Sequence, residues 1–152
     1  SDILDGSIHQ INISRYISEE ALKESATKLV PANSILIVSR VGVGKIAITK
    51  ETICTSQDFT NFTPKKDDLT FLAYYLQTQA NTLLGFSQGM AIKGFTKDDI
   101  SKLNLSIPSL AEQQRIAACL SSLDDLINAQ SQKIEALKEH KKGLLQGLFP
   151  QM

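Results

Sequence analysis

A glycine-containing turn over residues 39–46, Ser-Arg-Val-Gly-Val-Gly-Lys-Ile, holds the residue types that most often bind phosphate. A phosphate loop of the Walker type requires glycine where Ser39 stands and a magnesium-binding hydroxyl where Ile46 stands. A dinucleotide-binding loop, G-x-G-x-x-G/A, is formally met by Gly42, Gly44 and Ala47, but that loop must open a helix. A strand-like segment follows instead, so the sequence favours a turn that requires positive φ over a nucleotide site.

Residues suited to acid-base or nucleophilic catalysis are few and far apart in this sequence. The two histidines, His9 and His140, have no serine or cysteine neighbour that they could activate. Carboxylates between Asp124 and Glu139, beside Lys141, could suggest a nuclease, but they lie on one expected helix and would not converge on a metal ion. We therefore predict no catalytic residues and no metal site on this chain.

Composition describes an ordinary globular protein of 152 residues, with 42% hydrophobic and 21% charged residues. Cys54 and Cys119 form no C-x-x-C pair, so neither a disulfide framework nor a zinc site is expected, and their apolar neighbours are typical of small core residues. No apolar run approaches the roughly 20 residues needed to cross a bilayer, and the N-terminal segment lacks the pattern of a secretion signal. We expect a cytoplasmic protein that does not contact membranes.

Charge is unevenly distributed, although 16 basic residues balance 16 acidic residues over the whole chain. Residues 35–66 carry a net charge of +3 and also contain polar side chains able to read base edges. A second polar, glycine-containing stretch follows at residues 86–94. A solvated surface and a nucleic-acid contact surface both account for this pattern. The residues that we expect to contact DNA are Ser39, Arg40, Lys45, Gln57, Ser87, Gln88 and Lys93.

The elements that must position these residues follow from hydrophobic periodicity and capping signals. We predict strands over residues 35–38 and 45–49 joined as a hairpin, an extended segment over 53–62, and a short strand over 105–108. Helices are expected over 18–29, over 69–84 with Gly85 just past its end, and over 100–103 with a Thr96–Asp99 cap. The fold class is α+β: a compact domain over residues 1–108 with a mixed or antiparallel sheet and short helices, followed by a long coiled-coil helix over 109–152.

The last quarter of the chain carries a heptad repeat, with apolar residues at eight of ten a and d positions between residues 116 and 148. Gln130 and Lys141 are the two interruptions. A helix over residues 111–149, starting at the S-x-x-E sequence Ser109 to Glu112, would be roughly 58 Å long, longer than a domain of this size is wide. We expect it to pair with another helix. The residues expected to carry this pairing are Ile116, Leu120, Leu123, Ile127, Ile134, Leu137 and Leu144.

Several stretches between Asn33 and Gln146 occur together in one order. They are residues 33–40 (Asn-Ser-Ile-Leu-Ile-Val-Ser-Arg), 44–47 (Gly-Lys-Ile-Ala), 71–76 (Phe-Leu-Ala-Tyr-Tyr-Leu), 94–96 (Gly-Phe-Thr), 107–116 (Ile-Pro-Ser-Leu-Ala-Glu-Gln-Gln-Arg-Ile) and 141–146 (Lys-Lys-Gly-Leu-Leu-Gln). With this order and spacing the chain resembles the specificity subunits of type I restriction-modification systems. The strongest single element is residues 108–116 leading into a heptad helix.

The resemblance implies a target recognition domain that binds double-stranded DNA, followed by one of the long helices that pair antiparallel and dock the modification subunits. It also implies that the chain is a non-catalytic specificity subunit. Adenine methylation with S-adenosylmethionine would belong to the methyltransferase (modification) subunits, and ATP-driven translocation and cleavage to the restriction subunit. S-adenosylmethionine, ATP and Mg are therefore expected on partner subunits and no cofactor on this chain.

The chain departs from the family pattern because it has one recognition domain and one long helix, where a family subunit has two of each. Family domains also begin some tens of residues earlier. We therefore expect a half-subunit or a fragment whose recognition domain is incomplete at its N-terminus. If the chain folds alone, we expect a homodimer through antiparallel C-terminal helices that reads a palindromic, bipartite site. The alternative is a protein-interaction adaptor assembled through its coiled-coil helix.

Overall fold

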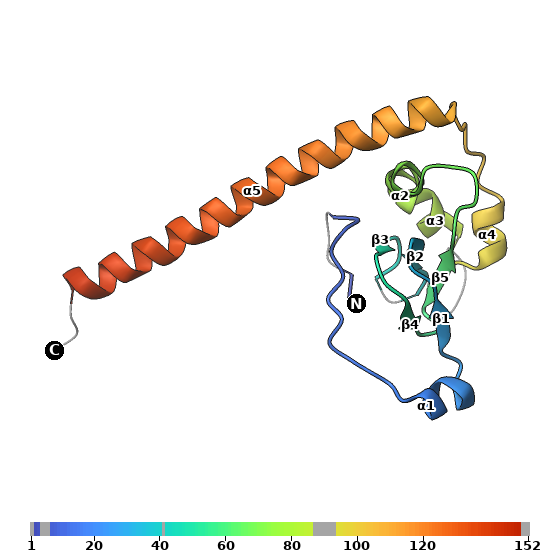
Figure 1. Ribbon diagram of the computed structural model, residues 1–152, viewed down its shortest axis with the longest axis horizontal. Coiled ribbons are helices and arrows are strands. Elements are labelled where there is room, and N and C mark those ends of the chain that lie inside the picture. Colours follow the sequence, from blue (N-terminus) through green and yellow to red (C-terminus); the bar gives the residue numbers. More distant parts are fainter. Residues whose placement is uncertain (1, 4–6, 41, 87–93, 150–152) are drawn as a thin grey trace. The chain divides into compact units, whose positions relative to one another are not determined.

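The structure is a computed structural model that describes residues 2–3, 7–40, 42–86 and 94–149 (Figure 1). The chain divides into two compact units, Ser1–Ala117 and Ala118–Met152. The first unit contains all the strands and the short helices of the described residues, and the second contains most of the last helix.

The centre of the first unit is a three-stranded antiparallel sheet formed by β2 (Ser34–Val38), β3 (Ile46–Thr49) and β5 (Phe59–Phe62) in the order β3-β2-β5. Every residue of β2 and β3 is buried. Because side chains alternate along a strand, Ile35 and Ile37 point to one face and Leu36 and Val38 to the other. The sheet therefore has two buried faces, as its continuous apolar runs require, and the predicted hairpin is confirmed.

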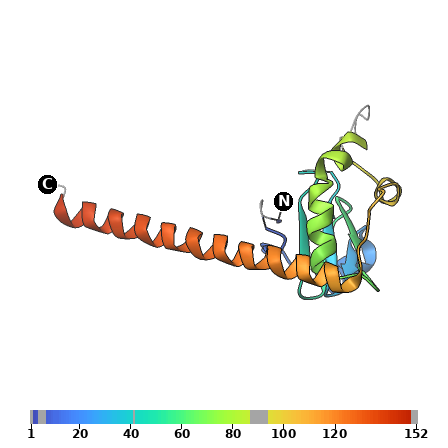
Figure 2. The same cartoon turned by 90° about the horizontal axis from the view of Figure 1, so that it is seen from above.

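One face of the sheet packs against α2 (Leu69–Thr78), whose Phe71, Leu72, Ala73 and Leu76 join the larger core cluster (Figure 2). The other face packs against Ile3 and Val30 in a smaller cluster. Asp68 caps the start of α2, because its carboxylate accepts a hydrogen bond of 2.8 Å from the backbone N–H of Phe71.

A second, two-stranded antiparallel sheet pairs β1 (Lys28–Val30) with β4 (Ile53–Thr55). The extended segment predicted over 53–62 is therefore two strands in different sheets, separated by a turn at 56–58 in which Ser56 Oγ accepts a hydrogen bond from Asp58 N. The helix predicted over 18–29 was also too long. The helix is α1 (Glu19–Glu24), because residues 28–30 form strand β1, which pairs with β4 and buries Val30.

The helix predicted over 69–84 is interrupted at Gln79, which separates α2 from α3 (Ala80–Phe86). The N–H of Gln79 bonds to the Leu76 carbonyl at 3.0 Å, a tightened last turn that ends α2. Gly85 consequently lies inside α3 and does not follow the end of a helix, contrary to prediction.

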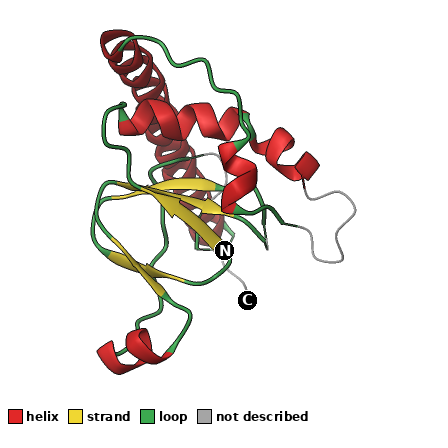
Figure 3. Cartoon of the chain, turned by 90° about the vertical axis from the view of Figure 1, so that its right-hand side faces the viewer, coloured by secondary structure: helices red, strands yellow, loops and turns green. Residues whose placement is uncertain are grey.

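Thr96 and Asp99 form the predicted cap, but the helix that they start, α4 (Lys97–Ser101), begins three residues earlier than expected. The strand predicted over 105–108 is absent from this described segment, which is irregular (Figure 3). The backbone N–H of Ser106 donates instead to the Tyr75 hydroxyl at 3.1 Å, so it has a partner without joining a sheet.

The last helix, α5 (Leu110–Leu148), matches the predicted span within one residue at each end. Its first two turns belong to the first unit, where Gln113 and Ala117 are buried. The Gln113 side chain accepts a hydrogen bond from Asp68 N and donates to Asp67 and to the Pro108 carbonyl, at 2.8 to 3.0 Å. The helix starts at Leu110, and the compact unit continues into it as far as Ala117. The α+β architecture with antiparallel sheets, short helices and a long C-terminal helix is confirmed.

Candidate nucleic-acid interface

A cleft of about 460 Å³ opens in the first unit where the end of β2, the β4–β5 turn and the segment before α4 meet. Its walls are formed by Lys28, Leu29, Val30, Pro31, Ser39, Arg40, Gln57, Phe59, Thr60, Asn61, Phe62, Thr63, Phe95, Thr96 and Lys97. Three of the predicted contact residues, Ser39, Arg40 and Gln57, are thus brought together at one place. We call this feature the cleft.

The charges on the cleft wall are all positive within the described part of the chain: Lys28, Arg40 and Lys97 line it, and no lining residue is acidic. The guanidinium of Arg40 lies 3.8 Å from the Asp58 carboxylate, and both side chains are more than 40% exposed. Such an exposed ion pair is weak and leaves most of the five guanidinium donors available. The cleft therefore presents a locally cationic surface on a chain of zero net charge.

Backbone hydrogen bonds hold the end of β2 in place. Ser39 donates to the Asp58 carbonyl twice, from its N–H at 2.7 Å and from its hydroxyl at 2.9 Å, and its own carbonyl accepts from Phe95 N at 3.1 Å. A Cβ atom at Gly94 would lie 2.6 Å from that carbonyl, so this approach requires glycine. We call Ser39, Asp58, Gly94 and Phe95 the backbone clamp. It fixes where Arg40 leaves the sheet.

Ser39 itself is 4% exposed, and its hydroxyl proton is engaged by Asp58. Ser39, a predicted contact residue, therefore supports the backbone at the edge of the cleft through these hydrogen bonds. Gln57, by contrast, is exposed in the β4–β5 turn. Asn61 on β5 donates to Thr55 at 2.7 Å, and its buried Oδ1 has no hydrogen-bond partner among the described residues. Because this oxygen is buried, it is not exposed to a molecule in the cleft as the side chain is placed here.

The remaining predicted contact residues lie elsewhere or are not described. Lys45 is half-buried in the turn between β2 and β3 and does not line the cleft. Gly42 and Gly44 in that turn have φ of 85° and 92°, and a strand follows them, so the predicted positive-φ turn is confirmed. Ser87, Gln88 and Lys93 fall outside the described residues.

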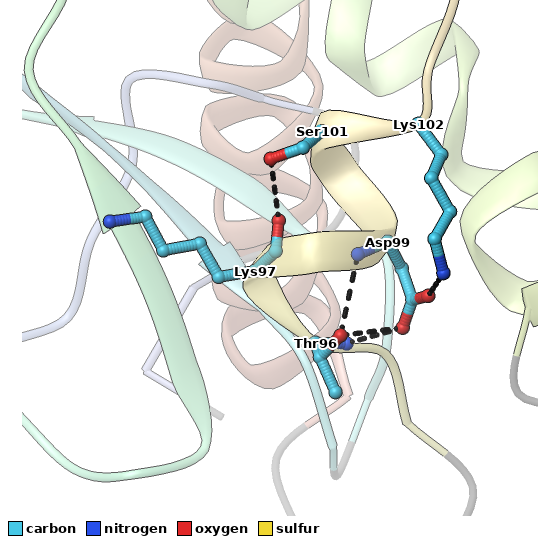
Figure 4. Close-up of polar contacts among 5 residues, drawn as sticks. All are labelled: Thr96, Lys97, Asp99, Ser101 and Lys102. Atoms are coloured by element: carbon cyan, nitrogen blue, oxygen red, sulfur yellow. Dashed lines mark hydrogen bonds and ion pairs between the residues drawn. The ribbon is translucent and has the colours of Figure 1, made fainter.

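Lys28 and Lys97 are cleft residues that the sequence did not single out. Lys97 is the first residue of α4, and Figure 4 shows its side chain directed away from Asp99. The Lys102 ammonium, the Thr96 backbone N–H and the Thr96 hydroxyl all donate to the Asp99 carboxylate, which lowers the pKa of Asp99 to about 2. The capping box therefore fixes the start of α4 beside the cleft, and with it the position of Lys97.

Other candidate chemistry is not supported by the structure. The expectation that Cys54 and Cys119 are core residues was wrong, because both are exposed. Cys54 lies on β4 and Cys119 on α5, and the side chain of each points to an uncovered face of its element. Over residues 2–3, 7–40, 42–86 and 94–149, no three His, Cys, Asp or Glu side chains form a group that could hold a metal ion. In the same residues, no helix is both long and apolar enough to cross a membrane.

The predicted pairing residues of α5 fall into two environments. Ile116 packs against the core of the first unit and Leu120 is half-buried. The five that follow are 50% to 61% exposed: Leu123, Ile127, Ile134, Leu137 and Leu144. The ion pairs of this segment, Lys138 with Glu135 and Lys142 with Glu139, link residues one turn apart on the same helix. An apolar stripe of this length without a cover is typical of a binding surface.

Residues 4–139 match the family described as "Type I restriction modification DNA specificity domain", and the chain belongs to this family. It is 33% identical over 138 residues to the type I restriction enzyme MjaIX specificity subunit of Methanocaldococcus jannaschii, a match that covers 89% of this chain and 32% of that one. The EcoR124I/EcoR124II specificity subunit of Escherichia coli is 31% identical over 121 residues, covering 75% and 30% of the two chains. The family resemblance predicted from the sequence is confirmed.

Solved structures agree on the fold. The S subunit from M. genitalium has a TM-score of 0.65 with 21% identity, over 80% of this chain and 34% of that chain. The HsdS subunit from Thermoanaerobacter tengcongensis has a TM-score of 0.60 with 21% identity, over 87% and 30%. The chain therefore spans about a third of the length of the relatives that it matches.

Proposed function

We propose that this chain recognises a DNA sequence through the cleft, as a non-catalytic part of a type I restriction-modification complex. The observation that carries this proposal is the local concentration of Lys28, Arg40 and Lys97 with the exposed carboxamide of Gln57 around the cleft, beside the backbone clamp. Membership of the specificity-domain family supports the same conclusion.

The side chains of the cleft suit the two kinds of contact that DNA recognition needs. Lysine ammonium groups bind phosphates, which fixes register without reading sequence. A guanidinium can pair with O6 and N7 of guanine, and a carboxamide with N6 and N7 of adenine. Lys45, Ser87, Gln88 and Lys93 would add contacts from the neighbouring turn and from the stretch before Gly94. Zero net charge is compatible with this function because the field at the cleft is local.

The proposal also assigns the parts of the chain and its partners. Residues 1–108 form the recognition domain and 109–152 the helix for pairing and subunit assembly. Modification subunits would methylate adenine with S-adenosylmethionine. A restriction subunit would carry out the cleavage that depends on ATP and Mg. The complex would act in the cytoplasm. This chain needs no cofactor for its own role, because recognition of a base sequence is a binding event.

The test is DNA binding by Arg40→Ala and Lys45→Ala variants in a complex reconstituted with modification subunits. Loss of a base contact costs about 1–3 kcal/mol, so Arg40→Ala should bind its site roughly tenfold to a hundredfold more weakly. Loss of a phosphate contact should lower the salt slope of the binding constant by about one. Lys50→Ala is the matched control, because Lys50 is exposed in the same basic stretch but does not line the cleft.

Unchanged affinity and an unchanged salt slope in both variants would reject the assignment. An effect of Arg40→Ala alone would restrict the contact surface to the cleft and remove Lys45 from it. The exposed face of α5 is the observation that favours the adaptor alternative. An adaptor would show no sequence preference in the same assay, with or without the modification subunits.

A further inference from the structure

One carboxylate lies beside the cationic cleft, and the proposed function gives it no role. Asp58, in the turn between β4 and β5, places its carboxylate 3.8 Å from the Arg40 guanidinium. Its main chain is fixed, because its carbonyl accepts two hydrogen bonds from Ser39 and its N–H donates to Ser56 Oγ. Among the described residues, the carboxylate itself interacts with Arg40 alone.

A carboxylate at this position opposes general binding of DNA. The phosphates of DNA and the Asp58 carboxylate carry the same sign of charge, so the side chain lowers the affinity of this surface for any duplex. The ion pair also contributes little to folding, because both of its side chains are more than 40% exposed. Neither attraction of DNA nor stability of the fold therefore accounts for Asp58 beside Arg40.

The Arg40 side chain is held at both of its ends. A Cβ atom at Gly94 would lie 3.3 Å from Arg40 Cγ, so the start of the side chain lies close to the main chain at Gly94. At the other end, the Asp58 carboxylate attracts Nη1 of the guanidinium. The backbone clamp fixes the main chain at Ser39, next to Arg40, and at Asp58. The guanidinium is thus oriented before DNA arrives.

The ion pair leaves Arg40 able to contact a base. A distance of 3.8 Å is too long for a hydrogen bond, so the contact with Asp58 does not occupy the N–H donors of Arg40. Asp58 approaches Nη1, whereas Nε and Nη2 form the parallel pair of donors that matches O6 and N7 of guanine. A phosphate could use the same donors, but the nearby carboxylate repels its charge, whereas the guanine base is uncharged.

We infer that Asp58 is a positioning residue that directs Arg40 to a guanine base instead of a phosphate, so that the recognised DNA site contains a G·C pair opposite Arg40. Asp58 acts through Arg40 and needs no contact with DNA of its own. Without its charge, Arg40 would bind the phosphates of any duplex more readily, and the preference for guanine would fall. This inference rests on the proposed function, because it names a base that the cleft would read.

The test uses the complex reconstituted with modification subunits and a library of DNA duplexes that contain a randomised segment. The duplexes bound by the wild-type chain and by Arg40→Ala, Asp58→Ala and Asp58→Asn are sequenced. Asp58→Asn removes the charge with little change of size, and both Asp58 variants keep the carbonyl that Ser39 uses. Glu51→Ala is the matched control, because it removes one negative charge from an exposed turn without removing the ion pair of Arg40. Thermal unfolding checks that each variant is folded.

The expected result is a preference for a G·C pair at one position of the wild-type motif, lost in Arg40→Ala and in both Asp58 variants while the other positions stay unchanged. The lost preference should be roughly tenfold to a hundredfold, the discrimination that one bidentate contact provides. Binding to a duplex without the motif should rise in the Asp58 variants and fall in Arg40→Ala. Glu51→Ala should select the wild-type motif.

A motif left unchanged by both Asp58 variants would overturn the inference. Uniformly weaker binding of every sequence by these variants would overturn it as well, because that result is expected of a residue with a purely structural role. Loss of preference at different positions in Arg40→Ala and Asp58→Ala, or at an A·T pair, would also contradict it. A wild-type complex without any sequence preference would reject the proposed function itself, so the two failures are distinguishable.

Discussion

The two units of the chain use their apolar residues in opposite ways. In Ser1–Ala117 the apolar side chains of β2, β3 and α2 are almost all buried against one another. In Ala118–Met152 the large apolar side chains at 123, 126, 127, 134, 137, 144, 145 and 148 are all about half exposed or more. The first unit contains the partners of its own core residues, whereas the described part of the second contains one helix and no second element.

This difference indicates where the stability of each unit originates. The first unit gains it from burial within the chain, and so it should unfold at a midpoint independent of protein concentration. Most helices in proteins owe their stability to packing of an apolar face, and a single helix in water is marginal. The second unit should therefore gain stability by association, with a midpoint that rises with chain concentration.

The largest effects are expected from two substitutions. One should lower the folding stability of the first unit, and the other should weaken assembly through the second unit. Leu76→Ala removes a side chain that is 1% exposed in the core of the first unit and should lower the free energy of unfolding by about 2–5 kcal/mol. Ile134→Asp puts a charge into the apolar stripe of α5 and should weaken assembly strongly, by more than any surface substitution on the same helix, while the first unit stays folded. Chemical denaturation followed by tyrosine fluorescence reports the first quantity, and light scattering reports the second.

The control for the helix variant is Gln132→Asp, which adds the same charge at an exposed position of α5 on the side away from the apolar stripe. It should leave the oligomeric state unchanged. If Ile134→Asp unfolded the first unit as severely as Leu76→Ala, the two units would not be separate in energy, and the contrast between them would fail.

A smaller effect, of opposite sign in the two units, is expected from glycine substitutions. At Gly94 an alanine Cβ would lie 2.6 Å from the Ser39 carbonyl oxygen, so Gly94→Ala should destabilise the first unit by about 1–3 kcal/mol. At Gly143, inside α5, nothing lies within 4 Å of the added atom, so Gly143→Ala should stabilise the helix by about 1 kcal/mol. Thermal unfolding of both variants measures whether each substitution raises or lowers the stability. A stabilising Gly94→Ala would show that the backbone clamp does not need its close contact.

The smallest effect expected concerns pH and the cap of α4. The pKa of Asp99 falls from 3.8 to about 2 on folding, through hydrogen bonds from Lys102 and Thr96. A lowered folded-state pKa means that the stabilisation is present above pH 3.8 and is lost as the pH falls toward 2. Asp99→Asn should make the unfolding midpoint less dependent on pH between pH 3.8 and pH 2. Asp98→Asn, in the same first turn but outside the capping box, should retain it.

The parts of the fold that were predicted correctly are those in which one local pattern decides the outcome. The continuous apolar run at 35–38, next to a glycine turn, favours a buried strand, and the heptad repeat between residues 116 and 148 predicts a long helix. The errors occurred where tertiary contacts override local propensity. Residues 28–30 leave a helical pattern because they pair with β4, and residues 53–62 divide because β4 and β5 join different sheets.

The candidate site shows the same limit. Arg40 and Gln57 were found because they lie near a glycine turn and in a basic stretch. Lys28 and Lys97 were missed because only the pairing of β1 with β4 and the Ser39–Phe95 hydrogen bond bring such distant residues to one cleft. Burial of Ser39 likewise depends on the position of Asp58, which no local pattern encodes.

If the cleft contacts DNA as proposed, the backbone clamp decides which of its positions can vary without disturbing the fold. Its contacts use the carbonyls of Ser39 and Asp58, the N–H groups of Ser39 and Phe95 and the missing side chain of Gly94, and only one side-chain atom, the Ser39 hydroxyl. The side chains at 40, 57 and 97 can therefore change without altering the main-chain path that presents them. A library randomised at these three positions, with Ser39 and Gly94 kept, should yield mostly folded proteins from which altered DNA preferences can be selected.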